Sequence, residues 1–174
     1  MPLPLGHAVL GLTTQHLISQ DTSVFKKWKL ALVVMILGNL PDIDVLIGLI
    51  FFGNGSAIHR GPTHSLLFVL VAGFVISRVL KWAPEMPRIG FRDCSLIILS
   101  HLAADYFFTS SPISFFFPFE NLTSNGYSGW RDVVSTVIFN NINDANIIFG
   151  CIIIIFFSLL ARYTYRALTA QPER

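Results

Sequence analysis

The sequence has few charged residues and few cysteines, and these shortages exclude several classes of protein. Charged residues make up only 13% of the 174 positions, whereas a soluble domain averages about 25%. The net charge of +2 and the lack of a long Lys/Arg run argue against nucleic-acid binding. Cys94 and Cys151 lie in apolar runs without C-x-x-C spacing, so we expect small packing residues and no disulfide or thiolate metal site. The first residues carry no basic region and no A-x-A motif, so we expect no cleaved signal peptide.

What the sequence has instead is long apolar runs, since 53% of its residues are hydrophobic. A transmembrane helix needs about 20 mostly apolar residues. Five segments approach or meet this requirement: 4–19, 30–52, 64–82, 93–109 and 146–164. We therefore predict an all-α fold, a polytopic membrane helical bundle in a single membrane-embedded domain over residues 1–174. The bundle has four transmembrane helices if segment 4–19 lies on the membrane surface and five if that segment crosses.

The connection over residues 110–145 is long and rich in Phe, Ser and Asn. It contains one short apolar run, VVSTVIF, which is too short to cross a membrane. We predict an outer connection whose short segment lies at the membrane interface or packs on the bundle. Tyr127 and Trp130 are then interpreted as interface anchors, and the polar stretch 140–146 as the turn and N-cap of the last span.

Basic residues cluster in alternate connections, and this pattern predicts the orientation of the chain. Three groups hold most of them: Lys26, Lys27 and Lys29; Arg78, Lys81, Arg88 and Arg92; and Arg162, Arg166 and Arg174. The other two connections hold only Arg60 and Arg131. Because cytoplasmic loops are enriched in Lys and Arg, we predict a multi-pass protein with a cytoplasmic C-terminus.

Polar residues from four segments are predicted to meet in the outer half of the bilayer. At about 1.5 Å per helical residue, Asp42 and Asp44 lie about 20 Å from the basic end of their segment. His101 and Asp105 lie about 14–20 Å from the basic end of theirs by the same count. The candidate metal ligands are His7, Asp42, Asp44, His59, His64, His101 and Asp105.

Three motifs give these residues a shared chemistry. HLAAD places His101 and Asp105 four residues apart on one helical face, where both can reach one ion. PDID places two carboxylates at a break caused by Gly38 and Pro41, where the freed backbone can face a polar cavity. HRGPTHS brings two imidazoles together across a Gly-Pro turn. Nitrogen and oxygen ligands without thiolate suit zinc or another divalent metal, and seven ligands exceed one tetrahedral shell.

Each motif also has an interpretation without a metal. The aspartates of PDID can cap or turn a helix at Pro41, and the His–Asp pair of HLAAD can be a buried hydrogen bond. The imidazoles of HRGPTHS can lie in a solvated loop. His16, near the basic end of its segment, is expected to be an interhelical hydrogen-bond partner rather than a ligand.

The ordered motifs GHAVLG, LPDID, HRGPTHSLL, SHLAADYF and SPISFFFPF resemble the YdjM-like family of bacterial inner-membrane proteins, described as membrane-bound metal-dependent hydrolases. The resemblance runs from about residue 5 to residue 165. It implies an all-helical fold, the inner membrane as location, the ligands named above, and a distant relation to the zinc-dependent phospholipase C and nuclease superfamily. Soluble members of that superfamily have further His and Glu ligands in their later part, whereas this chain has no His after His101. We therefore expect one or two zinc ions rather than three.

The leading hypothesis is an integral membrane metal-dependent hydrolase that acts on a phosphoester such as a lipid phosphate. One of Asp42, Asp44 or Asp105 would orient or deprotonate the attacking water, and Arg60 would hold the substrate phosphate. Membrane lipids are the expected partners, and nucleic acid is not. The alternative is a transporter or a proton- or ion-translocating protein, since buried Asp and His also mark ion pathways. A b-type haem protein with paired His ligands is a third hypothesis.

Overall fold

The computed structural model describes residues 3–20, 22–109, 111–120, 122, 127–139 and 142–169, with the backbone alone at Ile142 and Asn143. Every regular element in these ranges is a helix, which confirms the all-α prediction. The elements are α1 (Pro4–Ser19), α2 (Ser23–Lys26), α3 (Trp28–Asn39), the 3₁₀ turn η1 (Leu40–Asp42), α4 (Ile43–Phe52), the 3₁₀ turn η2 (Pro62–His64), α5 (Leu66–Trp82), α6 (Phe91–Phe108), α7 (Trp130–Phe139) and α8 (Ile142–Thr169).

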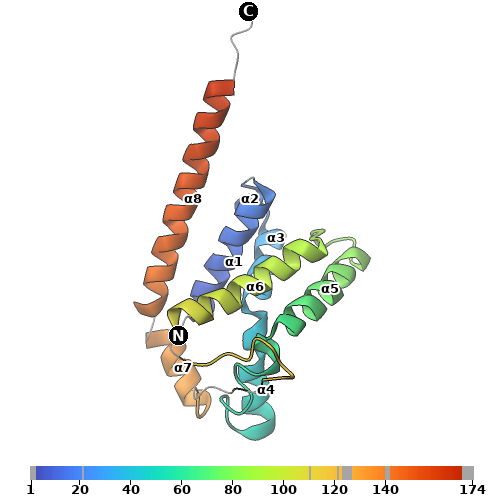
Figure 1. The fold of residues 1–174 in the computed structure, drawn as a ribbon, viewed down its shortest axis with the longest axis vertical. Coiled ribbons are helices and arrows are strands. Elements are labelled where there is room, and N and C mark those ends of the chain that lie inside the picture. The colour runs from blue at the N-terminus through green and yellow to red at the C-terminus, as the bar shows by residue number, and fades with distance from the viewer. Residues whose placement is uncertain are drawn as a thin grey trace, which may run out of the picture.

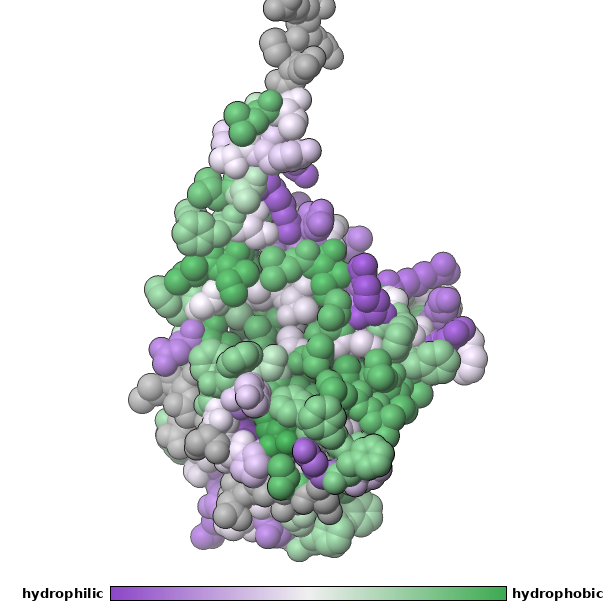
Figure 2. Space-filling view, viewed as in Figure 1, coloured by the Kyte–Doolittle hydropathy of each residue, from purple (hydrophilic) through white to green (hydrophobic). Residues whose placement is uncertain are grey.

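Among the described residues, two helical stretches are long and apolar enough to cross a membrane by length and composition. They are the 25 residues Trp28–Phe52, which include α3, η1 and α4, and the 26 residues Asp144–Thr169 of α8. Large apolar side chains are also exposed on the shorter helices, for example Phe74 on α5, which is 49% exposed. Figure 2 shows apolar side chains over much of the visible surface. Soluble monomers rarely expose apolar patches of more than a few hundred Å², so this surface favours a lipid environment.

The hydrophobic core lies along α6, which packs against α3 and against α5. Val34, Leu37, Ile97, Ile98 and Leu102 are almost completely buried there. Helix α1 packs against α3 and α6 on one side and against α8 on the other, while α8 packs mainly on α1. The two cysteines are buried and unpaired, as predicted.

Helices α1 and α3 approach each other closely because each has a glycine at the crossing. A Cβ atom added at Gly38 would lie only 2.7 Å from the backbone oxygen of His7, and one at Gly11 would lie 3.2 Å from that of Val34. Small residues allow such close packing between membrane helices. The crossing brings the start of α1, with His7, beside the end of α3 and the break that follows it.

The predicted break in segment 30–52 is a short 3₁₀ turn, η1, between α3 and α4. Pro41 occupies the start of this turn, where its missing N–H costs no hydrogen bond. Gly38 lies inside α3 and serves the close helix contact, so the break itself is centred on Pro41. Asp42 directly precedes α4, but its side chain makes no capping hydrogen bond, so the capping interpretation of Asp42 is wrong.

Asp144, in the first turn of α8, caps the start of α1. Its carboxylate accepts hydrogen bonds from the backbone N–H groups of Leu3 (2.7 Å) and Gly6 (3.0 Å), and it is 1% exposed. The sequence indicated that the stretch 140–146 caps the last span, so this carboxylate acts on a different helix from the one predicted. A carboxylate at a helix N-terminus satisfies orphan N–H donors and the helix dipole, so the last helix fixes where α1 begins.

The described residues of the predicted basic groups lie at one end of the bundle, and Arg174 lies outside the described residues. In Figure 1, α2, the connection from α5 to α6 and the C-terminal half of α8 all lie toward the upper end. One contact between them is the ion pair of Lys29 with Glu85, at 3.1 Å. Helices α4 and α7 lie toward the opposite, lower end.

Candidate metal centre

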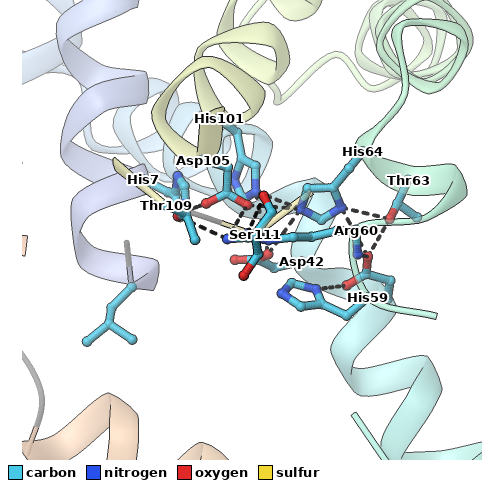
Figure 3. Close-up of polar contacts among 12 residues, drawn as sticks. His7, Asp42, His59, Arg60, Thr63, His64, His101, Asp105, Thr109 and Ser111 are labelled. Carbon is cyan, nitrogen blue, oxygen red and sulfur yellow. Dashed lines mark hydrogen bonds and ion pairs between the residues drawn. The ribbon is translucent and has the colours of Figure 1, made fainter. Parts of the chain in front are cut away.

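All of the predicted ligands meet in one buried cluster. Figure 3 labels each of them except Asp44, together with Arg60. Ligand atoms lie within 4.8 Å of one another in three groups. We call them the central group (Asp42, His64, His101), the α1 group (His7, His101, Asp105) and the loop group (Asp44, His59, His64). The cluster therefore joins α1, the break after α3, the 53–65 connection and α6, in the part of the bundle away from the basic end.

The three ligand atoms of the central group have separations that suit a tetrahedral metal. The Nε2 atoms of His64 and His101 are 3.2 Å apart. Oδ1 of Asp42 lies 3.4 Å from Nε2 of His101 and 3.5 Å from Nε2 of His64. Ligand atoms placed tetrahedrally at zinc–nitrogen distances of about 2.0–2.1 Å are about 3.3–3.4 Å from one another. Three ligands of this kind leave a fourth position for water or substrate, as in catalytic zinc sites.

Hydrogen bonds on the far side of each ring determine which nitrogens of the central group carry lone pairs. Nδ1 of His101 lies 2.8 Å from the carbonyl oxygen of Gly38, and a carbonyl only accepts, so Nδ1 is the protonated nitrogen. Nδ1 of His64 lies 3.1 Å from Oδ2 of Asp44, and Thr63 donates its own hydroxyl proton to that oxygen at 2.6 Å. Nδ1 of His64 is therefore also protonated. When both imidazoles are neutral, both Nε2 atoms therefore point a lone pair into the same space.

Two facing lone pairs beside a carboxylate oxygen repel one another unless a cation lies between them. Oδ1 of Asp42 is buried and has no hydrogen-bond partner among the described residues. The cluster as a whole contains three carboxylates and one guanidinium, which gives a net charge of −2 when the imidazoles are neutral. A buried charge of this size is costly without a counter-ion. The donor set and the charge both fit a divalent metal.

Asp44 differs from Asp42 because its acceptor capacity is filled by the protein. Its oxygens face Nδ1 of His59 (2.9 Å), the backbone N–H of Arg60 (3.1 Å), the hydroxyl of Thr63 and Nδ1 of His64. A carboxylate that accepts from the far nitrogen of a ligand histidine fixes the tautomer and orientation of that ring. Asp44 therefore organises the imidazoles of the loop group, while Nε2 of His59 keeps no partner in the described part of the chain.

In the α1 group, the imidazoles of His7 and His101 stack on each other, and Asp105 lies beside His7. The rings of His7 and His101 are nearly parallel, with centroids 3.7 Å apart and an interplanar angle of 19°. Nε2 of His7 lies 3.6 Å from Oδ1 of Asp105. Both nitrogens of His7 and both oxygens of Asp105 are buried without a hydrogen bond among the described residues.

The shared histidines limit how many ions the cluster can hold. His101 offers only Nε2, so the central and α1 groups compete for it. His64 also offers only Nε2, so the central and loop groups compete in the same way. The geometry is compatible with one ion in the central group or with ions in the flanking groups, and the expected number of one or two ions stays a prediction.

Arg60 is completely buried and already engaged, although the sequence assigned it to substrate. Its Nη2 lies 3.1 Å from Oδ2 of Asp105 and donates to Oγ1 of Thr109 at 3.1 Å, while Nη1 donates to the carbonyl of Ser111 at 3.4 Å. Its backbone has a left-handed φ of 64°, held by the hydrogen bond from its N–H to Asp44. Contact with a substrate phosphate stays a prediction, and the present geometry orients Asp105.

Sequence reasoning missed Tyr127 as a neighbour of the cluster and interpreted it as an interface anchor. Its side chain is 8% exposed, and its ring lies 6.2 Å from that of His59. Burial raises the pKa of the Tyr127 phenol to about 12, and the negative charge of Asp42 adds to the effect. The phenol is therefore protonated at neutral pH. No spacing rule links residue 127 to the histidines, so the sequence held no signal for this contact.

The family model described as YdjM inner membrane protein matches residues 1–169. No curated protein and no solved structure matches the chain. The match covers both long apolar helices and every ligand of the cluster. The chain therefore belongs to the YdjM inner membrane protein family.

Proposed function

We propose that this protein is an integral inner-membrane metal-dependent hydrolase acting on a phosphoester such as a lipid phosphate. The observation that carries the proposal is the central group, in which two imidazole lone pairs and an unpartnered carboxylate oxygen converge within 3.2–3.5 Å. Zinc is the preferred ion because the ligands are nitrogen and oxygen without thiolate.

The proposal includes five crossings, formed by α1, α3 with α4, α5, α6 and α8, with the C-terminus in the cytoplasm. The gathering of the basic groups at one end of the bundle supports this orientation. Asp42 and Asp44 lie in the second half of the span Trp28–Phe52, so the cluster lies in the half of the membrane away from the basic end.

The residues divide the chemistry as follows. Asp42, His64 and His101 would hold the ion, and a divalent ion there would make water nucleophilic at neutral pH and offset phosphate charge. Asp105, whose Oδ1 has no hydrogen bond and whose Oδ2 is ion-paired with Arg60, would take the proton of the attacking water. The oxygen of that water bonds to phosphorus, the P–O bond to the alcohol breaks, and the proton passes to the leaving alcohol. Arg60 beside Asp105 places positive charge where the phosphate would bind.

Elemental analysis of the detergent-purified protein tests the metal centre directly. We expect a stoichiometric divalent metal in the wild type and its loss in Asp42→Asn. Asp93→Asn, which changes a carboxylate at the start of α6 that pairs with Arg92, is the matched control and should keep the metal. Metal-replete protein would then be assayed on phosphoesters. Wild-type protein without metal, or equal metal in Asp42→Asn, would contradict the proposal.

The second candidate is a proton- or ion-translocating protein, because a proton shared between the Nε2 atoms of His64 and His101 would also relieve their repulsion. The ligands gather in one cluster rather than in a file along the bundle, which favours the hydrolase. Flux through proteoliposomes that survives chelation would favour translocation. The face-to-face stacking of His7 and His101 argues against haem, since axial ligands must lie on opposite faces of the macrocycle.

A further inference from the structure

Among the candidate ligands in the described part of the chain, Asp42 is the one that reaches the surface. The histidines of the cluster and the carboxylates of Asp44 and Asp105 are at most 1% exposed, whereas the side chain of Asp42 is 17% exposed. A cavity of about 350 Å³ lies at Asp42. The cavity therefore offers a route through the described residues from the surface to Asp42.

The wall of the cavity is apolar except at its inner end. It is formed by the first residue of α1, the end of α3, the η1 turn, α4, Tyr127 and α7, and its polar lining groups are Asn39, Asp42 and Tyr127. At the rim, Ile36 is 56% exposed, Leu46 46% and Val137 38%. The cavity thus has an apolar body and a polar end at the cluster.

In the proposed membrane placement, the mouth of the cavity lies at membrane depth. Ile36 and Leu46 both belong to the span Trp28–Phe52, well inside its ends. A water-soluble phosphoester would have to cross this apolar wall to reach Asp42. A hydrocarbon chain moves from the bilayer into the cavity without leaving an apolar environment.

On the basis of the proposed function, we propose that the substrate is a membrane lipid phosphate that reaches the centre sideways from the bilayer. One hydrocarbon chain lies in the cavity between α3, α4 and α7, and the phosphate lies at Asp42. Two observations support this assignment. The apolar wall of the cavity extends to Asp42, and Asp42 is the only candidate ligand among the described residues that is partly exposed. The phenol of Tyr127, protonated at neutral pH, lines the cavity as a hydrogen-bond donor.

The binding test uses phosphatidic acid with a photoreactive diazirine at the end of one chain, in detergent micelles with full-length protein. We expect crosslinks on α4 and α7 that unlabelled phosphatidic acid suppresses and glycerol 3-phosphate does not. Leu46→Trp fills the cavity and should lose these crosslinks. Leu70→Trp on α5, where the leucine is 53% exposed but does not line the cavity, should keep them. Labelling spread over α5 and α8, or unchanged labelling in Leu46→Trp, would overturn the inference.

The activity test separates the lipid site from the proposed hydrolase. We expect Leu46→Trp to keep its metal and to lose far more hydrolysis of phosphatidic acid than of p-nitrophenyl phosphate, which has no hydrocarbon chain to place in the cavity. Val137→Trp fills the cavity from α7 and should have the same effect. Equal loss on both substrates would overturn the inference. If cavity crosslinking is specific but wild-type protein holds no metal and hydrolyses neither substrate, the hydrolase fails and the lipid site stands. If both substrates are hydrolysed and Leu46→Trp changes neither rate, the hydrolase stands and the lipid site fails.

Discussion

The two sides of the cluster differ in how their carboxylates are used. On the closed side, Asp44 is fully buried and faces four donors supplied by the protein. On the open side, Asp42 is partly exposed to the cavity, and its Oδ1 faces two imidazole lone pairs with no donor. The two residues are identical in type and two positions apart. Their hydrogen bonds, rather than their identity, separate the organiser from the ligand.

The η1 turn explains why neighbours in sequence act on opposite sides. Asp42 ends the 3₁₀ turn and faces the cavity, whereas Asp44 lies in the first turn of α4 and faces the connection that carries His59 and Thr63. A continuous helix would place residues two apart about 200° apart around its axis, and both could not converge on one cluster. The break therefore lets one short motif supply both a ligand and its organiser.

The largest expected effect comes from removing the organiser. Asp44→Ala leaves the buried N–H of Arg60, the Thr63 hydroxyl and two imidazoles without their acceptor, which should cost about 3–5 kcal/mol of stability. It should also lose the metal, because His64 is no longer oriented. Thermal unfolding in detergent and elemental analysis measure both effects. If Asp44→Ala had the stability of the wild type, the hydrogen bonds of Asp44 would not set it apart from Asp42.

Removing the ligand should affect the metal without affecting the fold. Asp42→Asn takes a charge from an oxygen that has no protein partner, so the metal-free protein should unfold at the wild-type temperature or slightly above it. Metal affinity should fall by more than the roughly 10–100-fold expected for a residue that only orients a ligand. Competition with a chromophoric chelator gives the affinity. The matching variant Asp44→Asn should lose less metal affinity than Asp42→Asn. The opposite order would mean that Asp44 is the ligand and Asp42 the organiser.

A smaller effect should follow from widening the helix crossing that supports both sides. Gly38→Ala places a Cβ 2.7 Å from the backbone oxygen of His7, so α1 must move away from α3. Overpacking of this kind costs about 1–3 kcal/mol, and the melting temperature should fall. Gly150→Ala on α8 is the control, because a Cβ there meets nothing within 4 Å. Equal melting temperatures for the two variants would show that the crossing tolerates separation.

The smallest effect concerns Tyr127, which lines the cavity and lies near the ring of His59. Its pKa is raised from the ordinary value of 10 to about 12, so the folded protein keeps this proton over a range in which the unfolded chain releases it. Stability should therefore fall as pH rises from 10 to 12. Melting curves of Tyr127→Phe should fall less steeply over that range. Tyr163→Phe, at a side chain that is 73% exposed, should follow the wild type.

The sequence predicted which residues meet but not what each does. HLAAD, PDID and HRGPTHS supply six of the seven candidate ligands in the cluster and GHAVLG supplies His7, and they could be predicted because helical spacing and membrane depth follow from residue counts. The difference between Asp42 and Asp44 could not be predicted, because it depends on which donors the fold brings to each oxygen. The same reason hides the contact of Tyr127, whose neighbours are far away in sequence.

The number of crossings illustrates a limit of a different kind. Segment 4–19 coincides with α1, but α1, α5 and α6 have only 16, 17 and 18 residues. Each is shorter than the roughly 20 residues that span a bilayer on their own. Whether such a helix crosses depends on its neighbours and on local bilayer thinning. Composition therefore identifies Trp28–Phe52 and α8 readily and leaves the shorter helices to experiment.

Because Asp144 caps α1, the start of α1 can reach its final position only late in the synthesis of the chain. The N–H groups of Leu3 and Gly6 are among the first to leave the ribosome, and their acceptor is made 138 residues or more later. The start of α1, with His7 one residue beyond Gly6, lacks its partner throughout that interval. Its final position is reached only after the beginning of α8 has been inserted. A nascent chain interrupted before residue 144 therefore has every candidate ligand of the cluster. It lacks the Asp144 carboxylate that caps α1 next to His7.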